Sequence, residues 1–392
     1  MTTTTHAPFV REPGGVSRSH GTSSADFARV LGGTTSESSE AVTLAGATPL
    51  VPAHPAEPTG TQRLTFAKAL NLGLRRALAD DDKVLLMGED IGRLGGVFRV
   101  TDGLLAEFGE DRVVDTPLAE SGIVGTAIGL ALRGYRPVVE IQFDGFVFPA
   151  FDQITTQLAK MHYRSRGRLS LPVVIRIPYG GAIGAIEHHS ESPEVLFAHT
   201  AGLRVVSPSN PAEAYAMIQQ AVASPDPVIF FEPKGRYWDK ADVDLDTVTL
   251  APHGAAPTGL DRARIARPGT DVTVVAYGPT VTTALKAADA AAAEGTSLEV
   301  IDLRSVSPLD TETIAASVRR TGRCIVVHEA PVVHGTGAEV AARITEECFY
   351  HLQAPVLRVG GFHAPYPVAK IEHDYLPGLD RLLDAVQRSL AF

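Results

Sequence analysis

Several features that mark whole classes of protein are missing from this chain of 392 residues. Only two cysteines occur, Cys324 and Cys348, and no CxxC or Cys/His spacing suggests a zinc site. This scarcity favours a reducing, cytoplasmic compartment. The longest apolar run, residues 123–132, has about half the length that crossing a bilayer requires. The N-terminus lacks the apolar core of a signal peptide, so we expect neither a membrane span nor a secretion signal.

Clusters of positive charge are also missing. The chain has 35 Lys and Arg against 45 Asp and Glu, a formal net charge of −10, and no stretch is dense in basic residues. Nucleic acids and anionic membranes attract their partners through clustered positive charge. We therefore expect no nucleic acid and no membrane as partner, and look instead for small molecules or other proteins.

Length and composition predict more than one folded domain. Because single hydrophobic cores stop growing at about 250 to 300 residues, 392 residues with 44% hydrophobic content predict two domains. Residues 1–61 are rich in Thr, Ser, Gly, Ala and Pro and predict a disordered N-terminal arm. The remainder divides into a first α/β domain at 62–235, an acidic linker at 236–265 and a smaller α/β domain at 266–392.

Short aliphatic runs alternate with helical stretches in both domains. An amphipathic helix is expected from Leu64 onward. The expected strands of the first domain are 83–88, 136–143, 171–178, 203–208 and 227–233, and its further helices are 120–133, 149–162 and 211–223. The same alternation begins again at residue 271. It predicts an α/β fold of two doubly wound domains, each with a parallel sheet covered on both faces.

Chemistry in such a fold is expected at the carboxyl ends of the strands. The loop at 179–194, YGGAIGAIEHHSESPE, presents His188 and His189. Paired histidines are compatible with a metal site, with a single catalytic imidazole, or with a plain solvent-facing loop. The aromatic segment FDGFVFPAFDQI, residues 143–154, fits either a heterocycle site or ordinary core.

One carboxylate, Glu120, begins the Gly-, Ala- and Ile-rich helical segment DTPLAESGIVGTAIGLALRG, residues 115–134. The simpler interpretation is that its charge complements the positive end of the helix dipole. The functional interpretation needs a ligand atom near the helix start that hydrogen-bonds a carboxyl group. The residues of this segment alone leave both interpretations open.

From about residue 62 to its end, the chain resembles the β subunit of the decarboxylating component of 2-oxoacid dehydrogenase complexes. The resemblance rests on ordered motifs: MGEDIG, DTPLAESGIVG, FVFPAFDQI, HHSESPE, FFEPK, VIDLRSVSPLD and VHEAP. HSESPEVLFAH and FFEPK make it most similar to the branched-chain 2-oxoacid dehydrogenase β subunit. A pyruvate or acetoin dehydrogenase β subunit is the near alternative, and a non-catalytic scaffold that docks the acyltransferase is an alternative of another class.

The resemblance implies a thiamine-diphosphate pyrimidine-binding domain followed by a transketolase C-terminal-like domain. It implies oxidative decarboxylation of a 2-oxoacid, with acyl transfer to a lipoyl group on the acyltransferase core. The GDG motif that holds Mg²⁺ and diphosphate in this family is missing from the chain. Thiamine diphosphate is therefore expected to be shared with an α subunit that holds the Mg²⁺, in an α2β2 heterotetramer.

The resemblance also assigns roles to individual residues. Glu120 matches the acid that hydrogen-bonds the pyrimidine N1′, and His189 matches a histidine that lines the channel for substrate and lipoyl arm; these two are the expected catalytic residues. Phe146 is expected to pack on the pyrimidine, and Gln142 is assigned with Glu120 and Phe146 to cofactor binding. A structural K⁺ is expected at the backbone carbonyls of Leu171, Val173, Val174, Ala221, Ser224 and Asp226.

Overall fold

The computed structural model describes residues 58–246 and 259–392, all within one folded unit, His54–Phe392. Nearly all of the predicted disordered arm, residues 1–61, lies outside the described residues, and so does the middle of the predicted linker at 236–265. In the part of the chain that the structure describes, no helix has both the length and the apolar character needed to span a membrane.

A seven-stranded sheet in the order β12-β6-β7-β5-β4-β2-β3 organises the first domain. Neighbouring strands of this sheet run parallel, except that β12 pairs with β6 in the antiparallel direction. Strand β12 comes from the second half of the chain. Its strands are β2 (Val84–Gly88), β3 (Val113–Asp115), β4 (Arg136–Glu140), β5 (Val174–Tyr179), β6 (Arg204–Val206), β7 (Val228–Pro233) and β12 (Ser305–Ser307).

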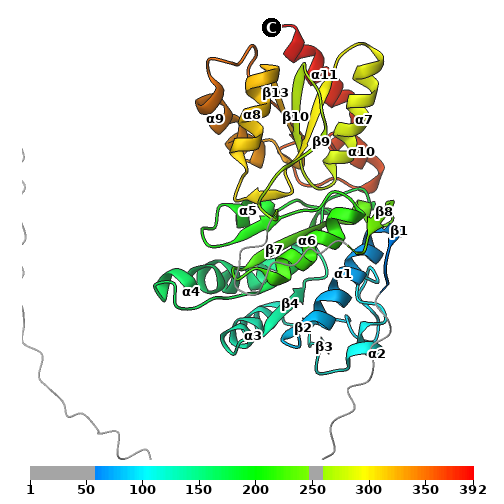
Figure 1. The fold of residues 1–392 in the computed structure, drawn as a ribbon, viewed down its shortest axis with the longest axis vertical. Coiled ribbons are helices and arrows are strands. Elements are labelled where there is room, and N and C mark those ends of the chain that lie inside the picture. Colours follow the sequence, from blue (N-terminus) through cyan, green and yellow to red (C-terminus); the bar gives the residue numbers. More distant parts are fainter. Residues whose placement is uncertain (1–57, 247–258) are drawn as a thin grey trace, which may run out of the picture. The chain divides into compact units, whose positions relative to one another are not determined.

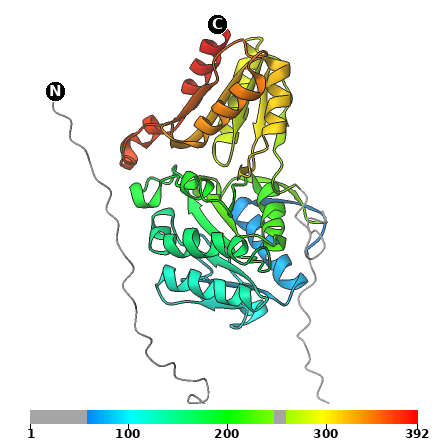
Figure 2. The same cartoon turned by 90° about the vertical axis from the view of Figure 1, so that its left-hand side faces the viewer.

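Three longer helices accompany this sheet: α1 (Phe66–Asp80), α3 (Glu120–Leu132) and α6 (Pro211–Ala223). Helices α1 and α6 pack side by side in both ribbon views (Figure 1 and Figure 2). Their approach is close at Gly73, where an added Cβ would lie 2.4 Å from Cγ2 of Ile218. A side chain at position 73 would therefore force the two helices apart.

The second domain has a five-stranded sheet in the order β14-β13-β10-β11-β9, parallel except at the β11–β9 edge. Its strands are β9 (Arg264–Arg267), β10 (Val272–Ala276), β11 (Leu298–Asp302), β13 (Cys324–Pro331) and β14 (Leu357–Gly361). Helix α7 (Thr280–Ala293) packs with α11 (Leu379–Leu390), and α8 (Thr311–Thr321) packs with α9 (Thr336–Cys348). The two domains seen in Figure 1 confirm the predicted α/β fold class.

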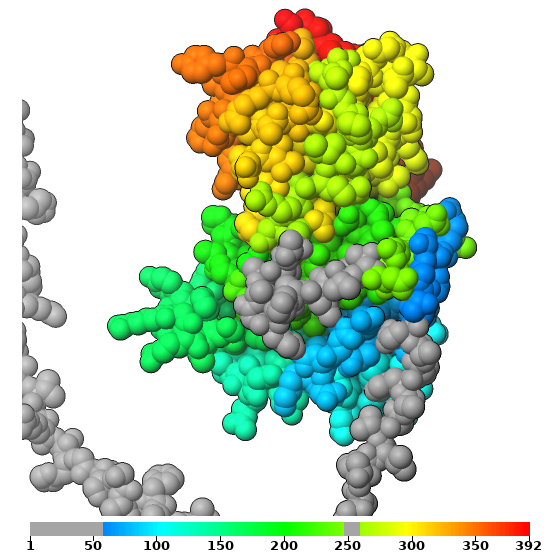
Figure 3. Space-filling model, in the orientation of Figure 1, coloured from blue at the N-terminus to red at the C-terminus, as the bar shows by residue number. Residues whose placement is uncertain are grey.

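Short elements complete the fold, and two of them differ from the prediction. Strand β1 (Thr61–Thr65) precedes α1, where a helix was expected from Leu64, and it pairs with β8 (Lys240–Asp244) inside the predicted linker. Figure 3 shows this two-stranded ribbon on the surface. The remaining short elements are α2 (Leu104–Phe108), α4 (Ala159–Arg164), α5 (Glu194–Ala198), η4 (Glu187–His189), η5 (Lys234–Arg236), η6 (Ala369–Ile371) and α10 (Glu372–Tyr375).

The stretch predicted as a helix at 149–162 is helical, but it is not one regular α-helix. The segment consists of a 3-10 turn η2 (Asp144–Ala150), a π-helical turn η3 (Gln153–Leu158) and only then α4. The Thr155 and Thr156 hydroxyls donate to the carbonyls of Phe151 and Asp152, both at 2.8 Å. These side-chain bonds compete for the carbonyls that an α-helix would use at this point.

Candidate active site

Glu120 is the first residue of α3, where it follows the N-cap residue Ala119. Its side chain is half-buried. The helix buries Ile123, Val124, Ala127, Ile128 and Ala131, but its opposite face, with Gly122, Gly125, Thr126 and Gly129, is exposed. The exposed face of α3 therefore consists mainly of small residues, and the large apolar side chains lie on its buried face.

A second acid, Glu89, lies beside Glu120. It directly follows β2, and burial, together with the negative charges of Glu120 and Asp90, raises the pKa of its carboxyl group. Its Oε1 atom is buried and has no hydrogen-bond partner. A carboxyl group with a raised pKa is more readily protonated and can share a proton with a ligand nitrogen nearby.

Gln142 connects these acids to the next strand. Its Nε2 donates to Oδ2 of Asp90 at 3.2 Å and to the Glu89 carbonyl at 3.4 Å. Strands β2 and β4 are neighbours with Gly88 opposite Glu140, so the residues that follow them emerge together. The structure thus brings Glu120, Glu89 and Gln142 together at the carboxyl ends of the strands, which we call the carboxyl edge of the sheet.

His189 lies farther along the same edge, in η4 after β5. Its ring centroid is 4.3 Å from that of Phe143 and 5.3 Å from that of Phe146. Burial lowers its pKa, the positive charges of His188 and Lys234 lower it further, and Asp144 opposes them. The lowered pKa favours the neutral imidazole. Its Nδ1 atom is buried and has no hydrogen-bond partner.

His188 behaves differently from its neighbour. Its side chain is half exposed, and its Nδ1 lies 3.9 Å from Oε1 of Glu187. Among the described residues, no group of three or more His, Cys, Asp or Glu side chains is placed to hold a metal ion. Of the interpretations that the paired histidines left open, the single half-buried imidazole of His189 fits the geometry best.

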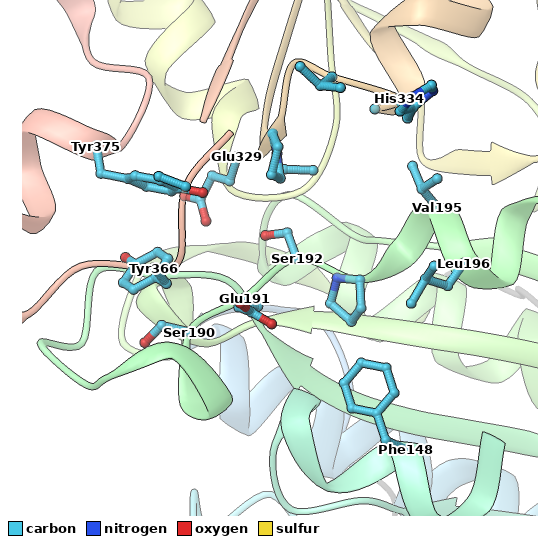
Figure 4. Close-up of a pocket in the computed structure, with 16 residues that line it drawn as sticks. Phe148, Ser190, Glu191, Ser192, Val195, Leu196, Glu329, His334, Tyr366 and Tyr375 are labelled. Atoms are coloured by element: carbon cyan, nitrogen blue, oxygen red, sulfur yellow. The ribbon is translucent and has the colours of Figure 1, made fainter. Parts of the chain in front are cut away.

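A cavity of about 300 Å³ opens next to this loop (Figure 4). Phe148, Glu191 and Leu196 line it from the first domain, and Glu329 and Tyr375 line it from the second. Neither Glu120 nor His189 is among its lining residues. The cavity therefore adjoins the loop of His189, but neither predicted catalytic side chain lines it.

The predicted potassium ligands lie at the other end of the sheet. The carbonyls of Leu171, Val173 and Ala221 accept backbone N–H groups at 2.8, 2.9 and 3.1 Å. The Asp226 carbonyl accepts the Ser224 hydroxyl at 3.0 Å, and the Ser224 carbonyl accepts the Arg136 guanidinium at 3.3 Å. Because each carbonyl has two lone pairs, these bonds leave room for a cation, and the K⁺ site stays a prediction.

Comparison with known families gives two matches along the chain. The family described as "Transketolase, pyrimidine binding domain" matches residues 62–239, and "Transketolase, C-terminal domain" matches residues 261–382. A solved structure titled "Split gene transketolase, inactive beta4 tetramer" aligns with a TM-score of 0.66 and 23% identity, covering 84% of this chain and 98% of that one. This likeness shows the fold.

Three relatives with higher identity carry three different names. "Pyruvate dehydrogenase E1 component subunit beta" of Leifsonia xyli is 62% identical over 331 residues, 84% of this chain and 96% of the relative. "3-methyl-2-oxobutanoate dehydrogenase subunit beta" of Mycobacterium tuberculosis is 56% identical over 331 residues, 84% of this chain and 93% of the relative. "2-oxoisovalerate dehydrogenase subunit beta" of Pseudomonas aeruginosa is 44% identical over 334 residues, 83% of this chain and 94% of the relative.

Proposed function

Because the chain belongs to the family of 2-oxoacid dehydrogenase β subunits, with their transketolase pyrimidine-binding and C-terminal domains, we propose that Glu120, Phe146 and His189 form its half of a thiamine-diphosphate site. The observation that carries this proposal is the position of Glu120 beside a second acid, Glu89, whose Oε1 atom is buried and has no hydrogen-bond partner. Two carboxyl groups side by side repel each other, which a protonated ligand nitrogen would relieve and a helix dipole alone does not require.

The residues present fit the cofactor. Thiamine diphosphate would supply, when bound, the carbon nucleophile for the carbonyl of a 2-oxoacid and would take up the electron pair left on the substrate carbon when CO₂ departs. Glu120 is assigned to hydrogen-bond the pyrimidine N1′, and beside it lies Glu89, whose pKa is raised by burial and by the charges of Glu120 and Asp90. Phe146 packs beside the pyrimidine, and Gln142 fixes the turn that carries Glu89.

His189 serves the later steps. A neutral imidazole can accept or donate a proton near pH 7, and its protonated form can steady a substrate carboxylate. We assign it to substrate binding and to proton delivery during acyl transfer to a lipoyl group. The neighbouring rings of Phe143 and Phe146 restrict the orientation of the imidazole.

The second half of the site is assigned to an α subunit that holds Mg²⁺ and the diphosphate, in an α2β2 assembly. Calorimetry on the isolated chain should then show no micromolar binding of thiamine diphosphate with Mg²⁺, while the assembly with its α chain binds both. Tight stoichiometric binding to the isolated chain would contradict this division. A scaffold without a catalytic role would fail to add cofactor affinity to the assembly.

Branched-chain 2-oxoacids are the proposed substrates, as the motifs HSESPEVLFAH and FFEPK indicate. Pyruvate is the second candidate, which the 62% identity to a pyruvate dehydrogenase β subunit favours. We expect the assembled enzyme to show a higher kcat/KM for 3-methyl-2-oxobutanoate than for pyruvate. Apolar pockets discriminate by only about 1–3 kcal/mol per methylene, so some turnover of pyruvate is compatible with this assignment. A higher kcat/KM for pyruvate would reverse it.

The K⁺ site at the six carbonyls is proposed as a structural element of the same subunit. Replacing KCl by NaCl at constant ionic strength should lower the thermal unfolding midpoint of the assembled enzyme if K⁺ is bound there. Equal midpoints in the two salts would remove the ion from the proposal.

A further inference from the structure

Lys234 is an ammonium group placed where water does not reach. It begins η5 directly after β7, and its side chain has no exposed surface. Burying a charge is unfavourable unless it is paired and hydrogen-bonded. The partner is the equally buried Asp144, whose Oδ1 atom accepts from Nζ, and the carbonyl of Pro178 lies 3.4 Å from the same nitrogen.

This ion pair crosses three strands at their carboxyl ends. Strand β5 lies between β7 and β4 in the sheet. Lys234 follows β7, Asp144 begins η2 after β4, and Pro178 belongs to β5 itself. The pair therefore lies across the end of the strand from which the loop bearing His189 departs.

The other oxygen of Asp144 holds that loop. Oδ2 accepts the backbone N–H of Glu191 at 3.0 Å, and the Glu191 carbonyl accepts the N–H of Gly180 at 3.0 Å. The next residue of η2, Gly145, is in close contact with the loop, since an added Cβ would lie 2.5 Å from the His188 carbonyl oxygen. Asp144 and Gly145 together form the surface on which residues 187–191 rest.

The same pair also places a charge close to His189. The Phe143 ring lies 5.6 Å from Nζ of Lys234 and 4.3 Å from the imidazole, both measured to its centroid, so it contacts both groups. The charged groups that act on the imidazole are His188, Lys234 and Asp144, with Glu187 and Glu191 in the same loop. Of the buried pair, Lys234 has the larger effect, and it lowers the pKa of His189.

We propose that Lys234 and Asp144 are positioning residues for His189: they fix the 187–191 segment against η2 and keep a positive charge beside its imidazole. This inference rests on the proposed function, which assigns His189 to substrate binding and acyl transfer. The two residues act through the loop and its charge environment. The pair thus supplies a reason for a buried lysine at the end of the FFEPK motif.

The test uses the assembled enzyme with the double variant Asp144→Asn/Lys234→Met. Asn and Met are neutral and similar in size to the Asp and Lys that they replace, and the Asn amide oxygen can still accept the Glu191 N–H. Diethyl pyrocarbonate reacts with the neutral form of an imidazole and not with its protonated form. Mass spectrometry follows the rate of modification at His189 at several pH values, and this rate reports the titration of His189. We expect its midpoint to rise by about half a pH unit or more, and turnover to fall about threefold or more near pH 7.

Two matched variants separate the causes. Asp289→Asn/Arg267→Met removes an exposed ion pair of the second domain and should leave both the midpoint and turnover unchanged. Lys234→Met alone removes the ammonium and keeps the Asp144 side chain, so the midpoint should move upward whether Asp144 stays ionised or takes up a proton. If the double variant fails to fold, the midpoint in this single variant decides.

An unchanged His189 midpoint in the double variant, or in Lys234→Met, would overturn the positioning role and leave the pair a purely structural one. Failure of the proposed function has a different signature. In that case His189→Asn would turn over normally, while the midpoint in the double variant would still shift.

Discussion

The carboxyl ends of the two sheets carry similar residues in opposite surroundings. Each edge has a histidine with one ring nitrogen buried and unpartnered, His189 in the first domain and His328 in the second. In both, burial is the main cause of a lowered pKa, which for His328 falls to about 4. A lowered pKa therefore does not by itself distinguish a reactive histidine from a structural one.

Access to the ring separates the two. His328 has no exposed surface, its Nδ1 lies 2.9 Å from the Ala330 carbonyl, and an added Cβ on Gly335, Gly337 or Gly360 would lie 2.6–3.1 Å from ring atoms. Its ring also stacks on Tyr277 with centroids 6.1 Å apart. No ligand fits between such neighbours, whereas His189 is only half-buried.

At Tyr277 and Asp302 the first half of the chain covers the carboxyl end of the second sheet. The Tyr277 hydroxyl donates to Oε1 of the buried Glu194 in α5 at 2.5 Å, and Ser209 donates to Asp302 at 2.5 Å. The second sheet thus uses the end where α/β domains bind ligands for contact with another part of the same chain. In the first sheet, the proposed site residues Glu120, Glu89 and His189 lie at that end.

The largest expected effect follows from replacing Glu120 by Gln, which is nearly isosteric. If Glu120 shares a proton with N1′, hydrogen–deuterium exchange at C2 of the cofactor should slow by a factor of about 100 or more in the assembled enzyme, as expected for lost acid–base assistance. If it only complements the dipole of α3, the change costs at most about 1 kcal/mol of stability. Normal exchange in a variant with an unchanged thermal midpoint would return Glu120 to the structural role.

The second prediction tests the closed edge through pH. Below pH 6.5 the unfolded chain binds a proton at His328, whereas the folded ring stays neutral down to about pH 4. Stability is therefore lost as the pH falls through this window, by about 3 kcal/mol at this residue. Glu194, with its pKa raised to about 7, and Asp302, with its pKa raised to about 6, change stability in the opposite direction over overlapping pH ranges.

Because several groups titrate together, the measurement is a difference between two proteins. His328→Gln removes the titrating ring and leaves Glu194 and Asp302 in place. The wild-type chain should lose about 3 kcal/mol more than the variant between pH 7 and pH 4 in denaturant unfolding. Parallel stability curves for the two proteins would show that His328 is not the source.

Local signals made part of this fold predictable from the sequence. Helix α6 has the predicted bounds because Asn210 caps it, its side chain accepting the Glu213 N–H, and because Pro211 occupies the first turn. The start of α3 at Glu120 also matches the prediction. The start of α6 is thus decided by residues adjacent in sequence, whereas α3 begins after Ala119 without a side-chain cap.

Contacts between distant residues were beyond such reasoning. Asp144 and Lys234 are 90 residues apart, and no periodic pattern joins them. Glu89 was part of a quoted motif, yet its proximity to Glu120 depends on neighbouring strands of the folded sheet. An acid directly after a buried strand is the one local signal that points to Glu89. Strand β8 escaped notice because it pairs with β1, far away in the sequence.

The smallest expected effect contrasts His189 with His328 directly. His189→Asn removes a half-buried ring that is not enclosed by its neighbours, so the thermal midpoint should stay within a few degrees of the wild-type value. Turnover in the assembled enzyme should fall about tenfold, less than the roughly hundredfold or more that a lost general acid or base typically costs. The fall should be larger for acyl transfer to lipoamide than for decarboxylation with an artificial electron acceptor. His328→Gln should show the reverse, with a lower midpoint and normal turnover per folded molecule. Equal losses of stability in the two variants would mean that the open and closed edges do not differ as the geometry indicates.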